Sequence, residues 1–219
     1  WTVVLKKYNL TSTLPTTQGQ KNVLARAKQI SDFKFTPVGR ILTKNLAYED
    51  TYFEPGVEYT GVPYASCEVN NKFVGENVTL ETLASAIENP DSVMYTKDMS
   101  AYRNGASYYG LVCNGHVRYS LGISHQRYNT AQWLQIPGMR EVCPLGQFKV
   151  EDLQLCDILH VATAENTKSV NHVALISDIL RDENGEVVMV EVSESTFPTT
   201  RRRKFNVEDF YKEFDIYRV

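Results

Sequence analysis

Three residues of this chain, Cys113, His172 and Glu194, are of the types that together perform nucleophilic catalysis. Residues 107–123, SYYGLVCNGHVRYSLGI, lead through two aromatics and a glycine into Cys113, and their later apolar residues follow a loose helical pattern. This pattern predicts Cys113 in the first turn of a helix, where unpaired N–H groups and the helix dipole favour the thiolate that attacks a carbonyl carbon. The alternative is that Cys113 is a small buried hydrophobic residue.

A cysteine nucleophile needs a base that holds the thiolate as an ion pair, and a third group that orients the base. His172 is the candidate base, because the four residues after it, VALI, are all apolar. This predicts that His172 stands at the mouth of a buried strand rather than on the surface. A core histidine with a satisfied hydrogen bond and no catalytic role is the alternative.

The candidates for the orienting group are Glu194 and Glu191, both in the next predicted strand. Side chains alternate along a strand, so Glu194 continues the apolar face of Val190 and Val192, whereas Glu191 shares a face with Ser193. We therefore expect Glu194 to reach the imidazole and Glu191 to be solvated. A β-bulge after the preceding hairpin would reverse this assignment and select Glu191.

Hydrophobic periodicity and turn residues indicate which elements position these groups. A helical front half followed by an antiparallel sheet predicts an α+β fold. The basic run RRRK at residues 201–204 is expected to form a solvated surface rather than a binding site for an anionic polymer. We expect helices at residues 18–30, 79–89, from about 109, 130–135 and 205–214, and strands at 1–8, 157–163, 172–179, 185–195 and 215–219, with a hairpin turn at 182–185.

Composition excludes several classes of function. With 42% hydrophobic and 22% charged residues among 219, the chain is expected to be a soluble globular protein. A net charge of -3 gives no general attraction to nucleic acid, and no apolar run reaches the roughly 18 residues that cross a bilayer. The four cysteines and four histidines lack CxxC, HxxxH and HExxH spacing, so we expect no metal and no cofactor. Because residue 1 is Trp, we expect processing upstream, compatible with a removed signal peptide.

The segments around these residues resemble the papain-like bacterial cell-wall cysteine peptidases of the NlpC type and their CHAP amidase relatives. Gly61-Val62-Pro63-Tyr64 is similar to the family's GxPY segment, and Asp157-Ile158-Leu159 resembles its GDxxxF strand, with Cys156 where glycine is usual. The histidine context NHVALI resembles HVAxI, and VSES at 192–195 resembles the CHAP pattern VSEQN, which also selects Glu194. The peptidase pattern would align Glu191 instead.

The chain departs from the family in two places. The common DCSGF core is VCNGH here, residues 112–116, with aspartate, serine and phenylalanine all replaced. A helical insertion at about 68–106 separates Tyr64 from Cys113. We accordingly expect residues 1–60 to be a lead-in that packs on the core and residues 61–219 to be an NlpC/CHAP-like domain.

The resemblance implies a papain-like fold with N-terminal helices on an antiparallel sheet, and a cysteine-dependent endopeptidase or amidase acting on peptidoglycan stem peptides. Cys113 would be the nucleophile, His172 the base and later acid, and Glu194 the orienting residue. The substrate is expected to contact Tyr64, Tyr109 and Asn114, and the protein to be secreted or associated with the cell wall.

Two other functions remain open from the sequence. A non-catalytic wall-binding or structural member of the same fold is favoured by the replaced DCSGF core. An acyltransferase using the same triad on a lipid would need an apolar entry groove. His116, three residues after Cys113, is expected to pack or to face solvent rather than to take part in chemistry.

Overall fold

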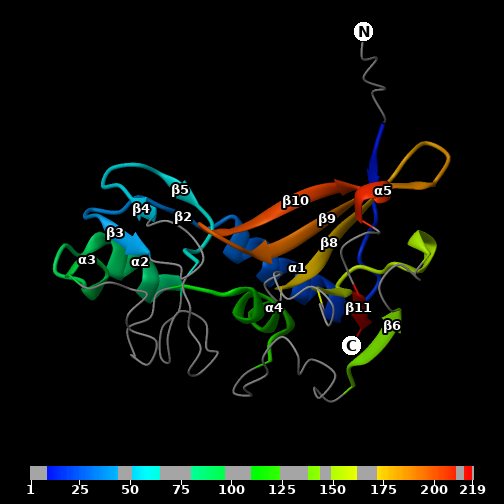
Figure 1. Cartoon of the computed structure of the whole chain (residues 1–219), viewed down its shortest axis with the longest axis horizontal. Helices are drawn as coiled ribbons and strands as arrows, with labels where there is room; N and C mark the ends of the chain where they lie inside the picture. The colour runs from blue at the N-terminus through cyan, green and yellow to red at the C-terminus, as the bar shows by residue number, and fades with distance from the viewer. Residues whose placement is uncertain are drawn as a thin grey trace, which may run out of the picture.

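The computed structural model of the chain describes residues 9–43, 51–64, 80–96, 110–123, 138–143, 149–161, 172–210 and 215–218. In these ranges, β-branched segments pair antiparallel into a curled, seven-stranded sheet, so the fold is mixed α+β (Figure 1). The strand order is β10-β9-β8-β7-β11-β6, with β1 beside β8. The strands are β1 (Thr11–Ser12), β6 (Arg140–Cys143), β7 (Ile158–Val161), β8 (His172–Arg181), β9 (Val187–Ser195), β10 (Thr200–Asn206) and β11 (Asp215–Arg218).

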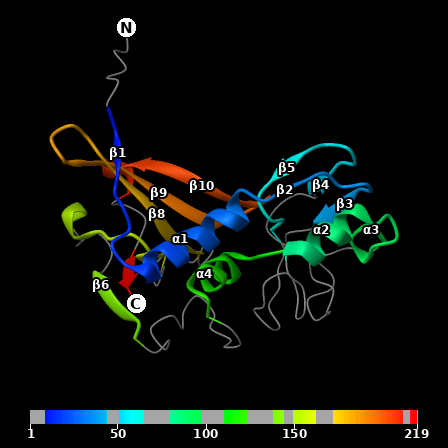
Figure 2. The same cartoon turned by 180° about the vertical axis from the view of Figure 1, so that it is seen from behind.

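Two helices, α1 (Gln18–Ser31) and α4 (Cys113–Leu121), lie side by side on one face of this sheet (Figures 1 and 2). Ala27 of α1 and Val117 of α4 pack with Val173 and Leu175 of β8 in one buried apolar cluster. Because Cys113 begins α4, this packing sets the nucleophile candidate against the sheet.

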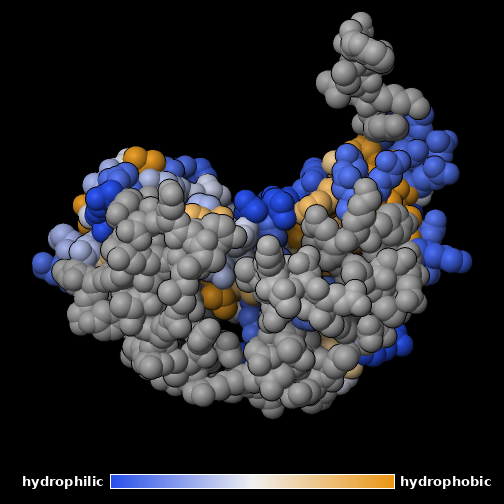
Figure 3. All heavy atoms as spheres, in the orientation of Figure 1, coloured by the Kyte–Doolittle hydropathy of each residue, from blue (hydrophilic) through white to orange (hydrophobic). Residues whose placement is uncertain are grey.

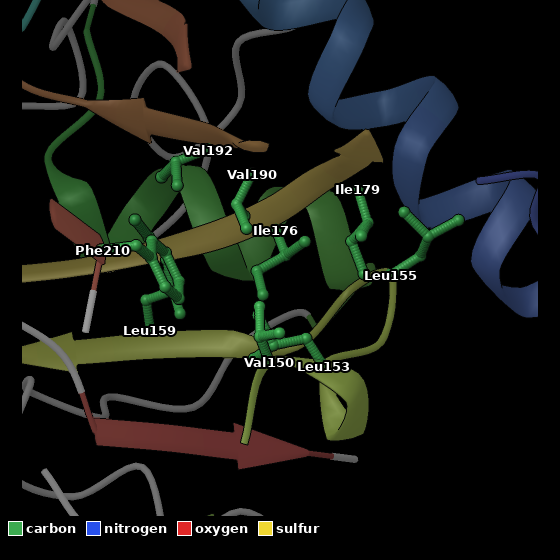
Figure 4. Packing of buried hydrophobic residues seen from close by; sticks show 10 residues of the cluster. Val150, Leu153, Leu155, Leu159, Ile176, Ile179, Val190, Val192 and Phe210 are labelled. Atoms are coloured by element: carbon green, nitrogen blue, oxygen red, sulfur yellow. The ribbon is translucent and has the colours of Figure 1, made fainter. Parts of the chain in front are cut away.

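The opposite face of the sheet carries a second apolar cluster (Figure 4). Ile176, Val190 and Val192 pack there with Phe210 of the short helix α5 (Val207–Phe210) and with Val150 of the 3-10 helix η2 (Val150–Asp152). Strands β8 and β9 are therefore buried on both faces, which makes the central pair a rigid base for residues at its ends.

A separate lobe is built from small antiparallel pairs and two helices (Figure 1). Its interior is aromatic: the Phe53 ring meets Tyr59 at 4.8 Å and Phe35 at 5.3 Å in edge-to-face geometry. Ile30 of α1 and Leu111 join the same cluster, so the lobe packs onto the residues that precede Cys113. The elements are β2 (Lys34–Phe35), β3 (Ile41–Thr43), β4 (Thr51–Phe53), β5 (Tyr59–Thr60), α2 (Leu80–Glu88) and α3 (Val93–Thr96).

Most of the predicted elements that fall on described residues are confirmed. The helices at 18–30 and 79–89 are α1 and α2, and the strands at 157–163, 172–179, 185–195 and 215–219 are β7, β8, β9 and β11. Apolar residues at spacings of three and four explain α1, whose start is closed by a capping box between Thr17 and Gln20. The predicted strand at 1–8 and helix at 130–135 lie outside the described residues.

Two predicted boundaries are wrong. The helix expected from about residue 109 begins at Cys113, and residues 110–112 are not helical. The closing helix expected at 205–214 begins only at Val207, because residues 200–206 form β10 along β9. Cross-strand pairing and the Phe205–Phe210 ring contact decide the conformation of this segment, and local periodicity reveals neither of them.

The described part of the chain contains no helix that is both long and apolar enough to cross a membrane.

The GVPY segment, residues 61–64, connects the lobe to the end of the sheet. The Gly61 N–H donates to the Phe33 carbonyl at 2.7 Å, and the Val62 N–H donates to the Thr200 hydroxyl at 2.8 Å. The Thr200 N–H in turn donates to the Val62 carbonyl at 2.9 Å. Gly61 has a φ of 90° and approaches Thr200 so closely that a Cβ would lie 1.9 Å from the Thr200 carbonyl oxygen. Only glycine fits at position 61, where the two backbones approach this closely.

Replacing Gly61 by Ala should therefore lower the free energy of unfolding by about 3 kcal/mol, because backbone strain and a clash with a backbone oxygen add together. Gly56→Ala is the matched control: Gly56 has a φ of 76°, but a Cβ there meets nothing within 4 Å, so a cost of about 1 kcal/mol is expected. Urea unfolding of both variants measures the difference, and equal destabilisation would contradict the close approach.

Candidate active site

Cys113 is the first residue of α4, after Val112 in an extended conformation with φ −89° and ψ 171°. Two hydrogen bonds hold the backbone just before it: the Leu111 N–H donates to the Pro63 carbonyl at 3.0 Å, and the Leu111 carbonyl accepts from the Ser195 hydroxyl at 2.7 Å. The GVPY segment and the end of β9 thus fix where the helix starts. Cys113 therefore lies at the positive end of the α4 dipole.

His172 is the first residue of β8, and its ring lies between an acid and the thiol. Nε2 is 2.9 Å from Oε2 of Glu194, and the side chain also makes a hydrogen bond with Cys113. Burial of the ring opposes its protonation, but the hydrogen bonds and negative charges of Cys113 and Glu194 outweigh burial and raise the pKa of His172 to about 9. The imidazolium is therefore the main form at neutral pH.

Glu194 is the most heavily paired residue of the site. Its side chain is buried, and it accepts hydrogen bonds from Nε of Arg201 at 3.0 Å and Nε of Arg203 at 2.6 Å as well as from His172. Burial alone would raise the pKa of this carboxyl, but the His172 and Arg203 contacts hold it at about 2. The carboxylate stays ionised, and its orientation is set from three directions.

The two glutamates of β9 lie on opposite faces, as alternation predicts. Leu175 of β8 stands opposite Ser193 of β9, a register that brings Glu194 to the end of the sheet where His172 begins its strand. The expectation that Glu191 is solvated is wrong: its side chain is 14% exposed, accepts from the Ser177 hydroxyl at 3.0 Å and pairs with Arg202 at 3.5 Å. Of the two candidates, Glu194 is the one hydrogen-bonded to His172.

The expected substrate-contacting residues are described only in part. Tyr64 follows Pro63 directly, is partly buried, and donates its N–H to the Pro198 carbonyl at 2.8 Å. Asn114 is buried as the second residue of α4. Tyr109 lies outside the described residues. Tyr64 and Asn114 thus belong to the segments that meet at Cys113.

His116 occupies the core position one turn after Cys113. The residue is fully buried, and Nε2 lies 3.0 Å from the Ser193 hydroxyl, which in turn lies 3.1 Å from the Ser31 hydroxyl. Burial lowers the pKa of His116 to about 3, so the ring stays neutral. Of the two expectations for His116, packing is confirmed.

Two arginines of the site were not anticipated from the sequence. The run at 201–204 was expected to be a solvated surface, but it is part of β10, and Arg201 and Arg203 both bind Glu194. The missed signal is the alternation within the run: once it is read as a strand beside VEVSES, its first and third residues share the face of Glu194.

Comparisons with protein-family models, with curated proteins and with solved structures find no match for this chain.

Replacing Glu194 by Gln should lower the pKa of His172 from about 9 by at least about one unit, because the amide carries no negative charge to stabilise the imidazolium. An NMR titration of the His172 ring protons measures this value. Glu191→Gln is the matched control on the other face of β9 and should leave the titration unchanged. An identical His172 titration in both variants would contradict the coupling.

Proposed function

We propose that this protein is a cysteine-dependent amide hydrolase of papain-like fold, an endopeptidase or amidase that acts on peptidoglycan stem peptides. The observation that carries the proposal is the hydrogen-bonded series Cys113–His172–Glu194, with the cysteine at a helix start and the histidine at a strand start. Nucleophilic cysteine catalysis uses this arrangement, a thiol hydrogen-bonded to an imidazole that a third group orients.

The proposed reaction begins with an ion pair between the Cys113 thiolate and the His172 imidazolium. The sulfur attacks the amide carbon, and the backbone N–H of Cys113 helps to stabilise the oxyanion. The imidazolium donates its proton to the leaving amine as the C–N bond breaks, which leaves a thioester on Cys113. Neutral His172 then takes a proton from water as the water oxygen attacks the thioester carbon. The C–S bond breaks and the acid product leaves, which restores the Cys113 thiolate and the His172 imidazolium. Glu194 keeps the imidazole ring oriented in every step.

The resemblance to NlpC-type and CHAP enzymes supports the substrate class. One backbone feature adds to it: Cys156 stands where the family usually has glycine, and its φ of 72° lies in the region that glycine adopts most readily. The GVPY segment also lies beside the residues that precede the nucleophile, because the Pro63 carbonyl accepts the Leu111 N–H.

A second candidate is a non-catalytic wall-binding member of the same fold. The replaced core residues Val112, Asn114 and His116 favour it, because they surround Cys113. The rate of alkylation of Cys113 as the pH is lowered separates the two. Continued reaction below neutral pH favours the ion pair, whereas inertness favours the binding module.

Cys113→Ala should abolish hydrolysis of peptidoglycan fragments while leaving the fold intact, because the alanine has no sulfur to form the thioester. Mass spectrometry of the products measures activity, and circular dichroism checks the fold. Cys156→Ala is the control: burial and the charge of Asp157 raise the pKa of the Cys156 thiol to about 12, so its loss should not affect turnover. Full activity in Cys113→Ala would remove the proposal.

The rate should fall on the alkaline side with an apparent pKa near 9, where His172 loses the proton that it must give to the leaving amine. The pKa of Glu194 is about 2, so protonation of this carboxylate should not limit the rate on the acid side. Initial rates of peptide hydrolysis between about pH 5 and pH 11 test this. A fall near the ordinary histidine value of about 6.5 would contradict the strong coupling of His172 to its neighbours.

A further inference from the structure

The two arginines that hold Glu194 also present charge to solvent beside the proposed catalytic residues. Arg201 and Arg203 each contact the Oε1 atom of Glu194 through Nε, yet their side chains remain 42% exposed, whereas the Glu194 side chain is 2% exposed. The carboxylate is therefore beneath the guanidinium groups, and part of each guanidinium faces outward. In the space-filling view, hydrophilic residues lie along the upper edge of the sheet, over β10 (Figure 3).

The charges around Glu194 do not cancel. One carboxylate meets two guanidinium groups and the imidazolium of His172, so three positive groups surround one negative group. Even with a Cys113 thiolate counted, the cluster keeps an excess of positive charge. A partly desolvated excess of this kind attracts an anion, and guanidinium groups bind carboxylates with two parallel N–H···O bonds.

The arginines are also held in place before any ligand arrives. Direct pairing in the sheet sets Arg201 opposite Glu194 and Arg203 opposite Val192, so both side chains lie on the face that carries Glu194. The Arg203 guanidinium lies 4.6 Å from the centre of the Phe205 ring, which orients its plane. Little side-chain entropy remains to be lost on binding.

We propose that Arg201 and Arg203 form a subsite for a carboxylate group of the substrate, next to the bond that is cleaved. The inference rests on the proposed hydrolase function and narrows its substrate class: peptides with a free carboxylate near the scissile amide are preferred over the same peptides with a carboxamide. Each arginine then has two roles, one toward the buried Glu194 and one toward the ligand.

Arg202 offers a matched control within the same strand. Its side chain lies on the other face of β10 and pairs with Asp32 at 2.7 Å and with Glu191 at 3.5 Å. Arg202→Gln removes one positive charge from the same run without touching Glu194. Any effect of net charge alone should therefore appear equally in this variant.

The first experiment compares two stem-like peptides that differ only in a carboxylate or carboxamide beside the scissile bond. Arg201→Gln and Arg203→Gln should each lower kcat/KM for the carboxylate peptide about tenfold more than for the carboxamide, the size expected for one lost charge-assisted hydrogen bond. Arg202→Gln should change both peptides alike. Because loss of an arginine can also disturb Glu194, the measure is the ratio of the two peptides rather than either rate.

The second experiment needs no enzymatic activity. Iodoacetate and iodoacetamide alkylate thiols through the same carbon but differ in charge, so their relative rates at Cys113, mapped by mass spectrometry, report an anion site beside the sulfur. The measure is the ratio of the iodoacetate rate to the iodoacetamide rate at Cys113, divided by the same ratio for a free thiol in solution. This normalised ratio should fall several-fold in Arg201→Gln and Arg203→Gln and persist in Arg202→Gln. Arg203→Lys keeps the positive charge and should retain most of the preference for iodoacetate. This variant controls for a loss of preference that comes only from misfolding.

The outcomes separate the two proposals. Arginine-dependent preference for iodoacetate with no hydrolysis of either peptide supports the subsite and removes the hydrolase function. Hydrolysis with peptide and reagent ratios that no arginine variant changes supports the hydrolase and overturns the subsite, leaving Arg201 and Arg203 as positioning residues for Glu194.

Discussion

A buried carboxylate is the constraint on which the rest of this structure depends. Placing the charge of Glu194 out of water costs several kcal/mol unless it is paired and hydrogen-bonded. Here the cost is offset by His172 from β8 and by Arg201 and Arg203 from β10, on either side of β9. In the strand order β10-β9-β8, the acid on β9 therefore lies between its positively charged partners on the two neighbouring strands. Disturbing either neighbouring strand removes part of the charge that compensates Glu194.

The position of the thiol depends on a second, mostly backbone, network. Ser195 is the residue after Glu194, and its hydroxyl binds the Leu111 carbonyl, two residues before Cys113. Pro63 holds the Leu111 N–H from the other side. The strand that carries the acid thus also anchors the start of the nucleophile helix. This explains how a cysteine and a glutamate 81 residues apart reach one imidazole ring.

His116, one of the residues that depart from the resemblance to NlpC-type enzymes, has a consistent place in the core. A histidine at position 116, on a helix that packs against the sheet, would be costly if charged or unpaired. Burial keeps it neutral, and Ser193 on β9 supplies a hydrogen-bond partner. The polar series Ser31, Ser193 and His116 links α1, β9 and α4 beneath the site.

The sequence by itself determined part of the secondary structure and the two faces of its central strands. Apolar periodicity predicted α1 and α2, alternation placed Glu194 and Glu191 on opposite faces of β9, and the apolar residues after His172 indicated a strand mouth. Only the tertiary structure decided the start of α4 at Cys113, the strand conformation of residues 200–206, and the role of Arg201 and Arg203. Local patterns report which face of an element is apolar, whereas these three features depend on contacts between segments distant in the chain, which no local pattern encodes.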